Sequence, residues 1–162
     1  MAPVSEIEPF SRQLSIPLPH SLDNRIYLSL TVKSKAVLLF ITTAPPDESS
    51  TATPLGSFVY ALPDRFNTTN PLSTPLCTVE ATLEFTTRLA KLLVRKTQLP
   101  VYVGNSVSFA SCGMGGGVEE EMDALKGTVG VVTAELEKHR TGATTDGNGV
   151  LSDGVEGLNI SS

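Results

Sequence analysis

The sequence predicts a single α+β domain, in which an antiparallel β-sheet is flanked by two main helices. Apolar residues alternate with a period of two over residues 25–33, as in a strand with one buried face, and recur at helical spacing over 78–96 and 118–140. The length of 162 residues suits one domain of ordinary size. We expect three parts: a flexible leader (1–11), the α+β domain (12–140) and a disordered tail (141–162).

The first strands are predicted from this alternation and from one apolar run. Residues 12–18 form a short extended segment that is stopped by prolines and a polar turn. In 25–33 the aliphatic residues share one face, and the intervening Tyr, Ser and Thr residues share the other. The run 36–41 is apolar at every position, so we expect a central strand covered on both faces. A tight connection at 33–35 joins the two strands as an antiparallel hairpin.

The middle of the chain alternates between polar loops and regular elements. Residues 43–56 are rich in Pro, Ser, Thr, Asp and Glu, which predicts a surface loop. Residues 57–62 form a strand, and 73–76 form a short extended segment. The clearest helix spans 78–96. It carries glutamates in its first turns and arginines and lysines towards its end, which matches the helix dipole.

The C-terminal part holds one more strand and the second helix. Pro100 ends the first helix, and a strand over 101–109 should return along the helix and rejoin the sheet. The glycine run 113–117 breaks the pattern before the helix 118–140. Two internal glycines each weaken that helix by roughly 1 kcal/mol relative to alanine. The remaining chain is mostly Gly, Ser, Thr and Asp, a composition that predicts disorder.

Composition excludes several classes of function. With 12 basic and 17 acidic side chains the net charge is −5, so no net positive field exists to bind nucleic acid. Two cysteines cannot form a disulfide framework and favour a reducing compartment. The first ten residues lack the basic and apolar regions of a signal peptide, and the longest apolar run is too short to span a bilayer. We therefore expect a cytoplasmic protein without a membrane partner.

The glycine run and the acidic residues after it do not predict a ligand site. The spacing over 113–117 matches neither a dinucleotide fingerprint nor a P-loop. Glu119, Glu120 and Glu121 occupy the first turn of the following helix, where they would repel a phosphate. With Asp123 they also lack the alternating pattern of a calcium loop. We interpret the run as a flexible loop that leads into a solvated helix end.

The cysteines and histidines do not predict a catalytic or metal site. Cys77, Cys112, His20 and His139 lie far apart and lack the spacing of metal ligands. No nucleophile elbow is present. We expect no catalytic residue, no metal and no cofactor. A small cysteine-dependent enzyme that uses Cys77 or Cys112 remains an alternative, which slow, ordinary reactivity towards a thiol alkylator would remove.

The two helices differ in charge. Residues 78–98 carry two acids and four bases, whereas 118–140 carry six acids and three bases. Such a division favours oriented docking of a protein partner, although two solvated faces with a chance bias are an equal alternative. We predict that the first helix presents a basic protein-docking surface formed by Arg88, Lys91, Arg95 and Lys96.

The chain resembles fungal-type members of the proteasome assembly chaperone 4 family. Four segments carry the resemblance in order: Ser73-Thr74-Pro75-Leu76, Leu89-Ala90-Lys91, Arg95-Lys96-Thr97 and Val101-Tyr102-Val103. An early hairpin over 26–41 precedes them, and 119–125 resembles the family's final helix. The resemblance covers about residues 12–138. The loop 43–56, the glycine run and the tail have no obvious counterpart in the family.

The resemblance implies a non-enzymatic chaperone that forms an obligate heterodimer with a proteasome assembly chaperone 3-like subunit. The pair would bind proteasome α-type subunits, notably the fifth, while the α-ring of the 20S core particle assembles. It would act in the cytoplasm and also in the nucleus. An alternative from another class is a small longin- or roadblock-like dimeric scaffold or trafficking adaptor, which strand order would distinguish.

Overall fold

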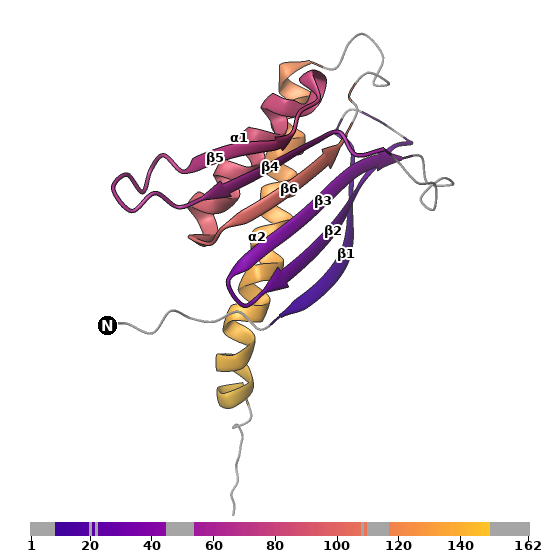
Figure 1. Cartoon of the computed structure of the whole chain (residues 1–162). Coiled ribbons are helices and arrows are strands. Elements are labelled where there is room, and N and C mark those ends of the chain that lie inside the picture. The colour runs from indigo at the N-terminus through magenta and orange to yellow at the C-terminus, as the bar shows by residue number, and fades with distance from the viewer. Residues whose placement is uncertain are drawn as a thin grey trace, which may run out of the picture.

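The computed structural model describes residues 9–19, 21, 23–44, 54–107, 109 and 117–149. Six strands and two helices follow one another along the chain: β1 (Phe10–Pro17), β2 (Arg25–Lys33), β3 (Ala36–Ala44), β4 (Ser57–Leu62), β5 (Leu72–Cys77), α1 (Glu80–Thr97), β6 (Val101–Ser106) and α2 (Val118–Gly149). The strands form one sheet, and both helices lie behind it in Figure 1. The predicted α+β class is therefore confirmed.

The sheet is mixed rather than wholly antiparallel. Its strand order is β1-β2-β3-β6-β4-β5, and β3 and β6 pair in parallel while every other neighbouring pair is antiparallel. Since β4 is antiparallel to both β5 and β6, these two strands point the same way, and α1 is the crossover helix that such a connection needs. The predicted return of the strand after α1 is confirmed. Its insertion between β3 and β4 was not predicted.

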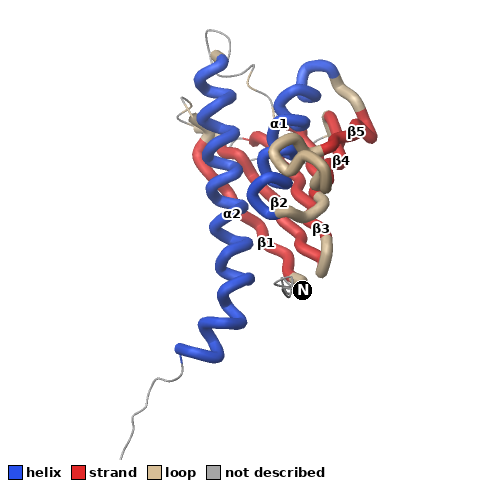
Figure 2. Tube along the Cα trace, turned by 90° about the vertical axis from the view of Figure 1, so that its left-hand side faces the viewer, coloured by secondary structure: helices blue, strands red, loops and turns tan. Residues whose placement is uncertain are grey.

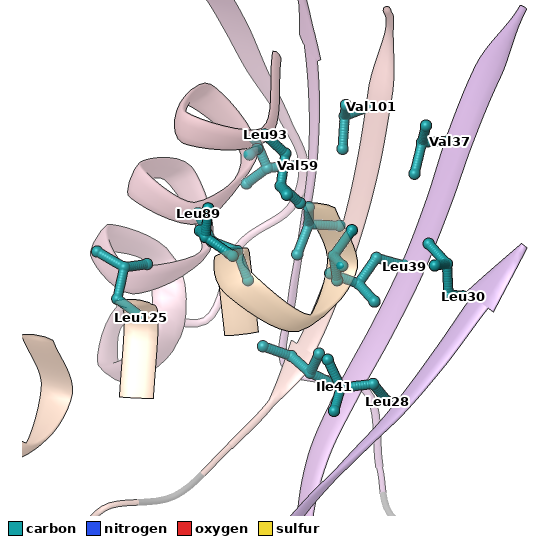
Figure 3. Close-up of a cluster of buried hydrophobic side chains, with 14 of the residues drawn as sticks. Leu28, Leu30, Val37, Leu39, Ile41, Val59, Leu89, Leu93, Val101 and Leu125 are labelled. Carbon is teal, nitrogen blue, oxygen red and sulfur yellow. The ribbon is translucent and has the colours of Figure 1, made fainter. Parts of the chain in front are cut away.

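One hydrophobic core lies between the sheet and the helices. Alternate residues of β2, β3, β4 and β6 point into it, and Leu89 and Leu93 of α1 and Leu125 of α2 close it from the other side (Figure 3). The prediction that residues 36–41 are covered on both faces is wrong. Val37 and Leu39 are fully buried, but Phe40 on the opposite face is 39% exposed. The central place of β3 in the sheet is confirmed.

Helix α1 is anchored at its first turn by a neighbouring strand. The Ser57 hydroxyl at the start of β4 accepts a hydrogen bond from the Val79 N–H at 2.9 Å, and it lies 2.8 Å from the Thr82 hydroxyl. Val79, the N-cap residue, has no side-chain cap of its own. At the other end Gln98 adopts a left-handed conformation with φ 57° and donates its N–H to the Val94 carbonyl.

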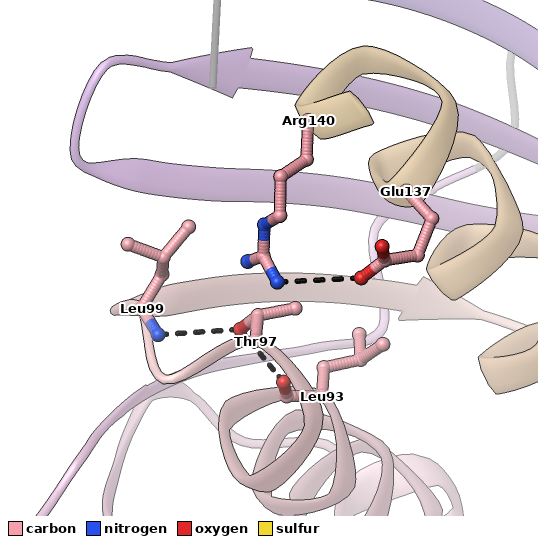
Figure 4. Close-up of polar contacts among 5 residues, drawn as sticks. All are labelled: Leu93, Thr97, Leu99, Glu137 and Arg140. Atoms are coloured by element: carbon pink, nitrogen blue, oxygen red, sulfur yellow. Dashed lines mark hydrogen bonds and ion pairs between the residues drawn. The ribbon is translucent and has the colours of Figure 1, made fainter. Parts of the chain in front are cut away.

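The end of α1 faces the later turns of α2 (Figure 4). The Thr97 hydroxyl donates to the Leu93 carbonyl at 2.8 Å and accepts from the Leu99 N–H at 3.2 Å, which closes the turn into β6. Across from it, Arg140 donates to Glu137 at 3.3 Å. The two Thr97 hydrogen bonds hold the last turn of α1 at the point where the chain re-enters the sheet, whereas the Arg140–Glu137 pair lies within α2.

Helix α2 is longer than predicted and stands along one side of the strands, beyond which it extends (Figure 2). It runs to Gly149 instead of ending at Arg140, so the first nine residues assigned to the disordered tail are helical. Residues 150–162 and 1–8 lie outside the described residues, as does the part of the loop 43–56 between 45 and 53. Neither described helix is long and apolar enough to cross a bilayer.

Small differences occur at two further strand ends. Strand β1 begins at Phe10, inside the expected leader, because Phe10 already pairs with Val32 of β2. The Phe10 ring also stacks on His139 of α2, with 3.6 Å between centroids. Strand β6 ends at Ser106 rather than at residue 109. There the buried Asn105 side chain accepts the Val107 N–H at 2.7 Å, which replaces a strand hydrogen bond.

Candidate protein-binding surface

The face of the sheet that points away from the helices carries a band of aromatic side chains. The alternation of strands sends Leu38 and Phe40 of β3, Tyr102 of β6, and Phe58 and Tyr60 of β4 to this face. We call these five residues the aromatic face. None of them is fully buried, and no described element covers them.

The rings of the aromatic face are packed against one another across the strands. Tyr60 and Tyr102 are register partners, and their centroids lie 4.5 Å apart. Phe58 lies 5.8 Å from Phe40 and 6.2 Å from Tyr102. Such cross-strand aromatic pairs stabilise a sheet and restrict the rings to one arrangement. The surface is therefore organised before any partner arrives.

Gly104 of β6 makes room for Phe40. A Cβ atom at this position would lie only 2.4 Å from the Phe40 ring, so the ring rests directly on the β6 backbone. A hollow of about 380 Å³ opens beside it, bordered by Phe40, Leu55 and Gly104 and by polar groups of Thr42 and Ser106. It offers an apolar recess with a polar wall on the same face of the sheet.

Charge is absent from this half of the sheet, whereas the other half is polar. Strands β3, β4 and β6 contain no Asp, Glu, Lys or Arg. On β1 and β2 the outward side chains bond to each other: Gln13 donates to Ser29 at 2.9 Å and Arg25 to Ser15 at 3.1 Å. An uncharged aromatic centre beside a polar margin is the composition of a protein–protein interface.

The four predicted docking residues all lie on α1, but they do not have the same surroundings. Arg88 forms an ion pair with Glu84 one turn earlier, and both side chains are exposed. Within the described part of the chain, Lys91, Arg95 and Lys96 form no ion pair, and the last two are exposed in the final turn of the helix. The surface formed by all four stays a prediction.

The other candidate groups are not brought together. Cys77 is exposed at the end of β5, and His139 is stacked on Phe10. Cys112, His20 and most of the glycine run lie outside the described residues. In the described ranges no three His, Cys, Asp or Glu side chains cluster as metal ligands would.

One carboxyl group is tuned by its neighbours. The hydrogen bond from Lys138, at 2.8 Å, and the charges of Lys138, Arg12 and His139 lower the pKa of Glu135 despite its partial burial. The Arg12 guanidinium lies 3.9 Å from the same carboxylate. The Glu135 carboxylate therefore links β1 to α2, which is a structural role rather than a catalytic one.

Sequence reasoning missed the aromatic face. The signal was present in β4, where Phe58 and Tyr60 occupy alternate positions, and in β6, where Tyr102 lies between two valines. In β3 this signal was obscured, because an unbroken apolar run is typical of a strand that is buried on both faces of its sheet. In this chain the helices cover only one face of β3, and the other face remains an uncovered apolar surface.

A mixed sheet with helices on one face and an uncharged aromatic surface on the other defines a protein-binding α+β module. The family model described as "Proteasome assembly chaperone 4" matches residues 25–107, just over half of the chain. The chain belongs to the proteasome assembly chaperone 4 family, a family of assembly chaperones.

A solved structure has the same fold. It is described as "Crystal Structure of a Novel Chaperone Complex for Yeast 20S Proteasome Assembly", and the match has a TM-score of 0.57 with 18% sequence identity. It covers 80% of this chain and 98% of that chain. No curated protein matches the sequence. The matched family region begins at β2 and ends just after β6, so it includes every residue of the aromatic face.

Proposed function

We propose that this chain is a non-enzymatic chaperone of 20S proteasome α-ring assembly that works as one half of a heterodimer. The other half is a proteasome assembly chaperone 3-like subunit, and the pair binds α-type subunits, notably the fifth. It acts in the cytoplasm and in the nucleus. Family membership supports the role in proteasome assembly, and the fold shared with a chaperone complex supports work in a complex.

The observation that carries the proposal is the uncovered aromatic face. Phe40 is 39% exposed in the centre of a six-stranded sheet, where an apolar strand is normally covered on both faces. A second sheet packed about 10 Å away would cover it, as in a β-sandwich. The partner subunit would supply this second layer, and the recess beside Gly104 would receive one of its side chains.

The mechanism is differential affinity rather than chemistry. A chaperone that covers part of an α-subunit surface favours the correct neighbour only if it binds the correct arrangement more tightly than the wrong one. The stacked rings of the aromatic face are already ordered, so little conformational entropy is lost when the partner docks. The heterodimer would then present a fixed surface to the assembling ring.

Co-expression with the chaperone 3-like protein of the same organism tests the proposal. The expected result is a 1:1 complex by light scattering, which retains purified α-type subunits. Phe58→Lys places a charge in the aromatic face and should abolish the complex, whereas Ser11→Lys on the edge strand β1, which faces the same way but lies outside the recess, should leave it intact. Circular dichroism of each variant checks that the chain still folds.

Two outcomes would contradict the proposal. If Phe58→Lys folds and still forms the 1:1 complex, the aromatic face is not the heterodimer interface. If the chain forms only homodimers and retains no α-type subunit, the result would favour the scaffold or adaptor alternative instead.

A further inference from the structure

The topology gathers three connections at one end of the sheet. Strands β3 and β6 start side by side, with Val37 paired to Val101, and β4 ends there because Ala61 pairs with the same residue. The turn between β2 and β3, the loop between β4 and β5, and the turn from α1 into β6 therefore lie at this end, which we call the hairpin end (Figure 1).

The hairpin end is basic. Five exposed cations from three separate connections lie there: Lys33, Lys35, Arg65, Arg95 and Lys96. None of these five forms an ion pair within the described part of the chain. The single acid of these connections, Asp64, accepts the backbone N–H of Phe66. On the nearby turns of α2, Glu135 is paired with Lys138 and Arg12, and Glu137 with Arg140.

The opposite end of the molecule is acidic. Glu80 and Glu84 are exposed in the first turns of α1, and Glu119 and Glu121 lie in the first turn of α2. Glu120 between them is buried, so the interpretation of this helix end as solvated is wrong at that residue. Glu121 borders the same hollow as Val79 and Ser106, which places both helix starts at this end. Charge is thus divided along the strand direction, and not only between the two helices.

The hairpin end also presents an aromatic side chain. Phe66 is 100% exposed at the tip of the β4–β5 loop. The tip is held in place: Phe66 N–H donates to Asp64 Oδ1 at 2.9 Å, Asn70 N–H to the Asn67 carbonyl at 3.1 Å, and the Thr69 hydroxyl to Asn67 Oδ1 at 2.8 Å. Because the whole Phe66 ring is exposed to water, it buries no apolar surface and does not stabilise the fold.

We propose that the hairpin end is a second docking surface, which binds an acidic protein surface with an apolar recess for Phe66. This inference rests on the proposed function, and its occupant is the α-type subunit rather than the chaperone partner. The aromatic face provides the surface for the partner, and a chaperone that joins two proteins needs a separate surface for the other. Arg95 and Lys96, two of the four predicted docking residues, belong to the hairpin end.

The dimensions fit one interface. Neighbouring strands lie about 4.8 Å apart, and the midpoints of the β2–β3 turn and the β4–β5 loop are three strand spacings apart, which is roughly 15 Å. A standard interface covers roughly 800 Å² per partner, which spans that width. Exposed lysines and arginines around an aromatic anchor mainly accelerate encounter, whereas the buried anchor slows dissociation.

The test measures binding of an α-type subunit to the preformed heterodimer by surface plasmon resonance. Phe66→Ala should weaken binding roughly 30-fold, mainly through faster dissociation. Lys35→Glu should slow association roughly tenfold at low salt, and the difference should shrink at high salt. Two matched controls should bind as the wild type does: Thr68→Ala in the same loop, and Arg25→Glu, which changes the net charge equally at the start of β2, at the opposite end of the sheet.

Each outcome decides the inference. Unchanged α-subunit binding by Phe66→Ala and Lys35→Glu would overturn the inference while the proposed function stands. Loss of the heterodimer itself in Phe66→Ala would assign the tip to the chaperone partner, which also overturns it. If the wild-type heterodimer binds no α-type subunit, the proposed function and the inference both fall. Equal effects of Lys35→Glu and Arg25→Glu would show that only the net charge of the chain matters, which also overturns the inference.

Discussion

At the scale of single residues, two small side-chain environments decide the shape of the surface. Gly104 lets Phe40 lie flat on β6, which creates both the stacked aromatic row and the recess beside it. Asp64 accepts the backbone N–H of Phe66, which orders the backbone of the loop tip that carries the exposed ring. Neither arrangement follows from hydrophobicity alone, because both depend on a neighbour that is distant in sequence or on a local backbone hydrogen bond.

Gly104→Ala should move Phe40 and partly fill the recess. The added methyl would meet the ring at 2.4 Å, so the ring must turn away, at a cost of about 1–3 kcal/mol in the free energy of unfolding. Gly130→Ala is the matched control. Nothing lies within 4 Å of its added Cβ in the interior of α2, so this change should stabilise the chain by about 0.5–1 kcal/mol. Urea unfolding of both variants checks the opposite signs.

Glu135 should make stability depend on acid pH. Because Lys138, Arg12 and His139 lower its pKa in the folded chain, its stabilising contribution is fully present above the pKa of the unfolded chain, about 4.3, and is lost as the pH falls through the lower folded value. Glu135→Gln should therefore lower the melting temperature at pH 7, and the gap to the wild type should close in strong acid. A gap that stays constant down to pH 2 would show that the charge is not responsible.

At the scale of elements, local pattern and non-local pairing contribute different parts of the fold. The alternation in β2 and the helical stripe of α1 are local, and both elements occur where the sequence predicts them. The insertion of β6 between β3 and β4 depends on pairing between segments that are 64 residues apart for β3 and 40–48 residues apart for β4, which no local period encodes. The exposed second face of β3 was missed for the same reason, since an apolar run indicates cover but not which chain provides it.

The anchor between β4 and α1 should stabilise both elements. Ser57 is fully buried, and its hydroxyl accepts the Val79 N–H that α1 cannot satisfy from its own N-cap. Ser57→Ala removes this acceptor and should cost about 1–2 kcal/mol in the free energy of unfolding. Thr87→Ala, at a half-buried position two turns into α1, is the control and should change stability far less. Equal effects in the two variants would contradict the anchoring role.

At the scale of the whole molecule, the chain has two unlike surfaces. The uncharged aromatic face covers the middle of the sheet, and the cations of the hairpin end lie at the edge where three connections meet. The sequence correctly predicts a basic α1 and an acidic start of α2. It does not reveal that Lys33, Arg65 and Arg95 share one end, because 62 residues separate the first from the last and only the sheet brings them together.

The most direct test of the central claim is hydroxyl-radical footprinting of the chain alone and of the purified heterodimer. We expect Phe58, Tyr60 and Tyr102 to lose most of their reactivity in the heterodimer, because the partner covers the aromatic face. Phe66, fully exposed at the hairpin end, should react equally in both samples. Unchanged oxidation of the three aromatic-face residues in a complex that does form would contradict the account.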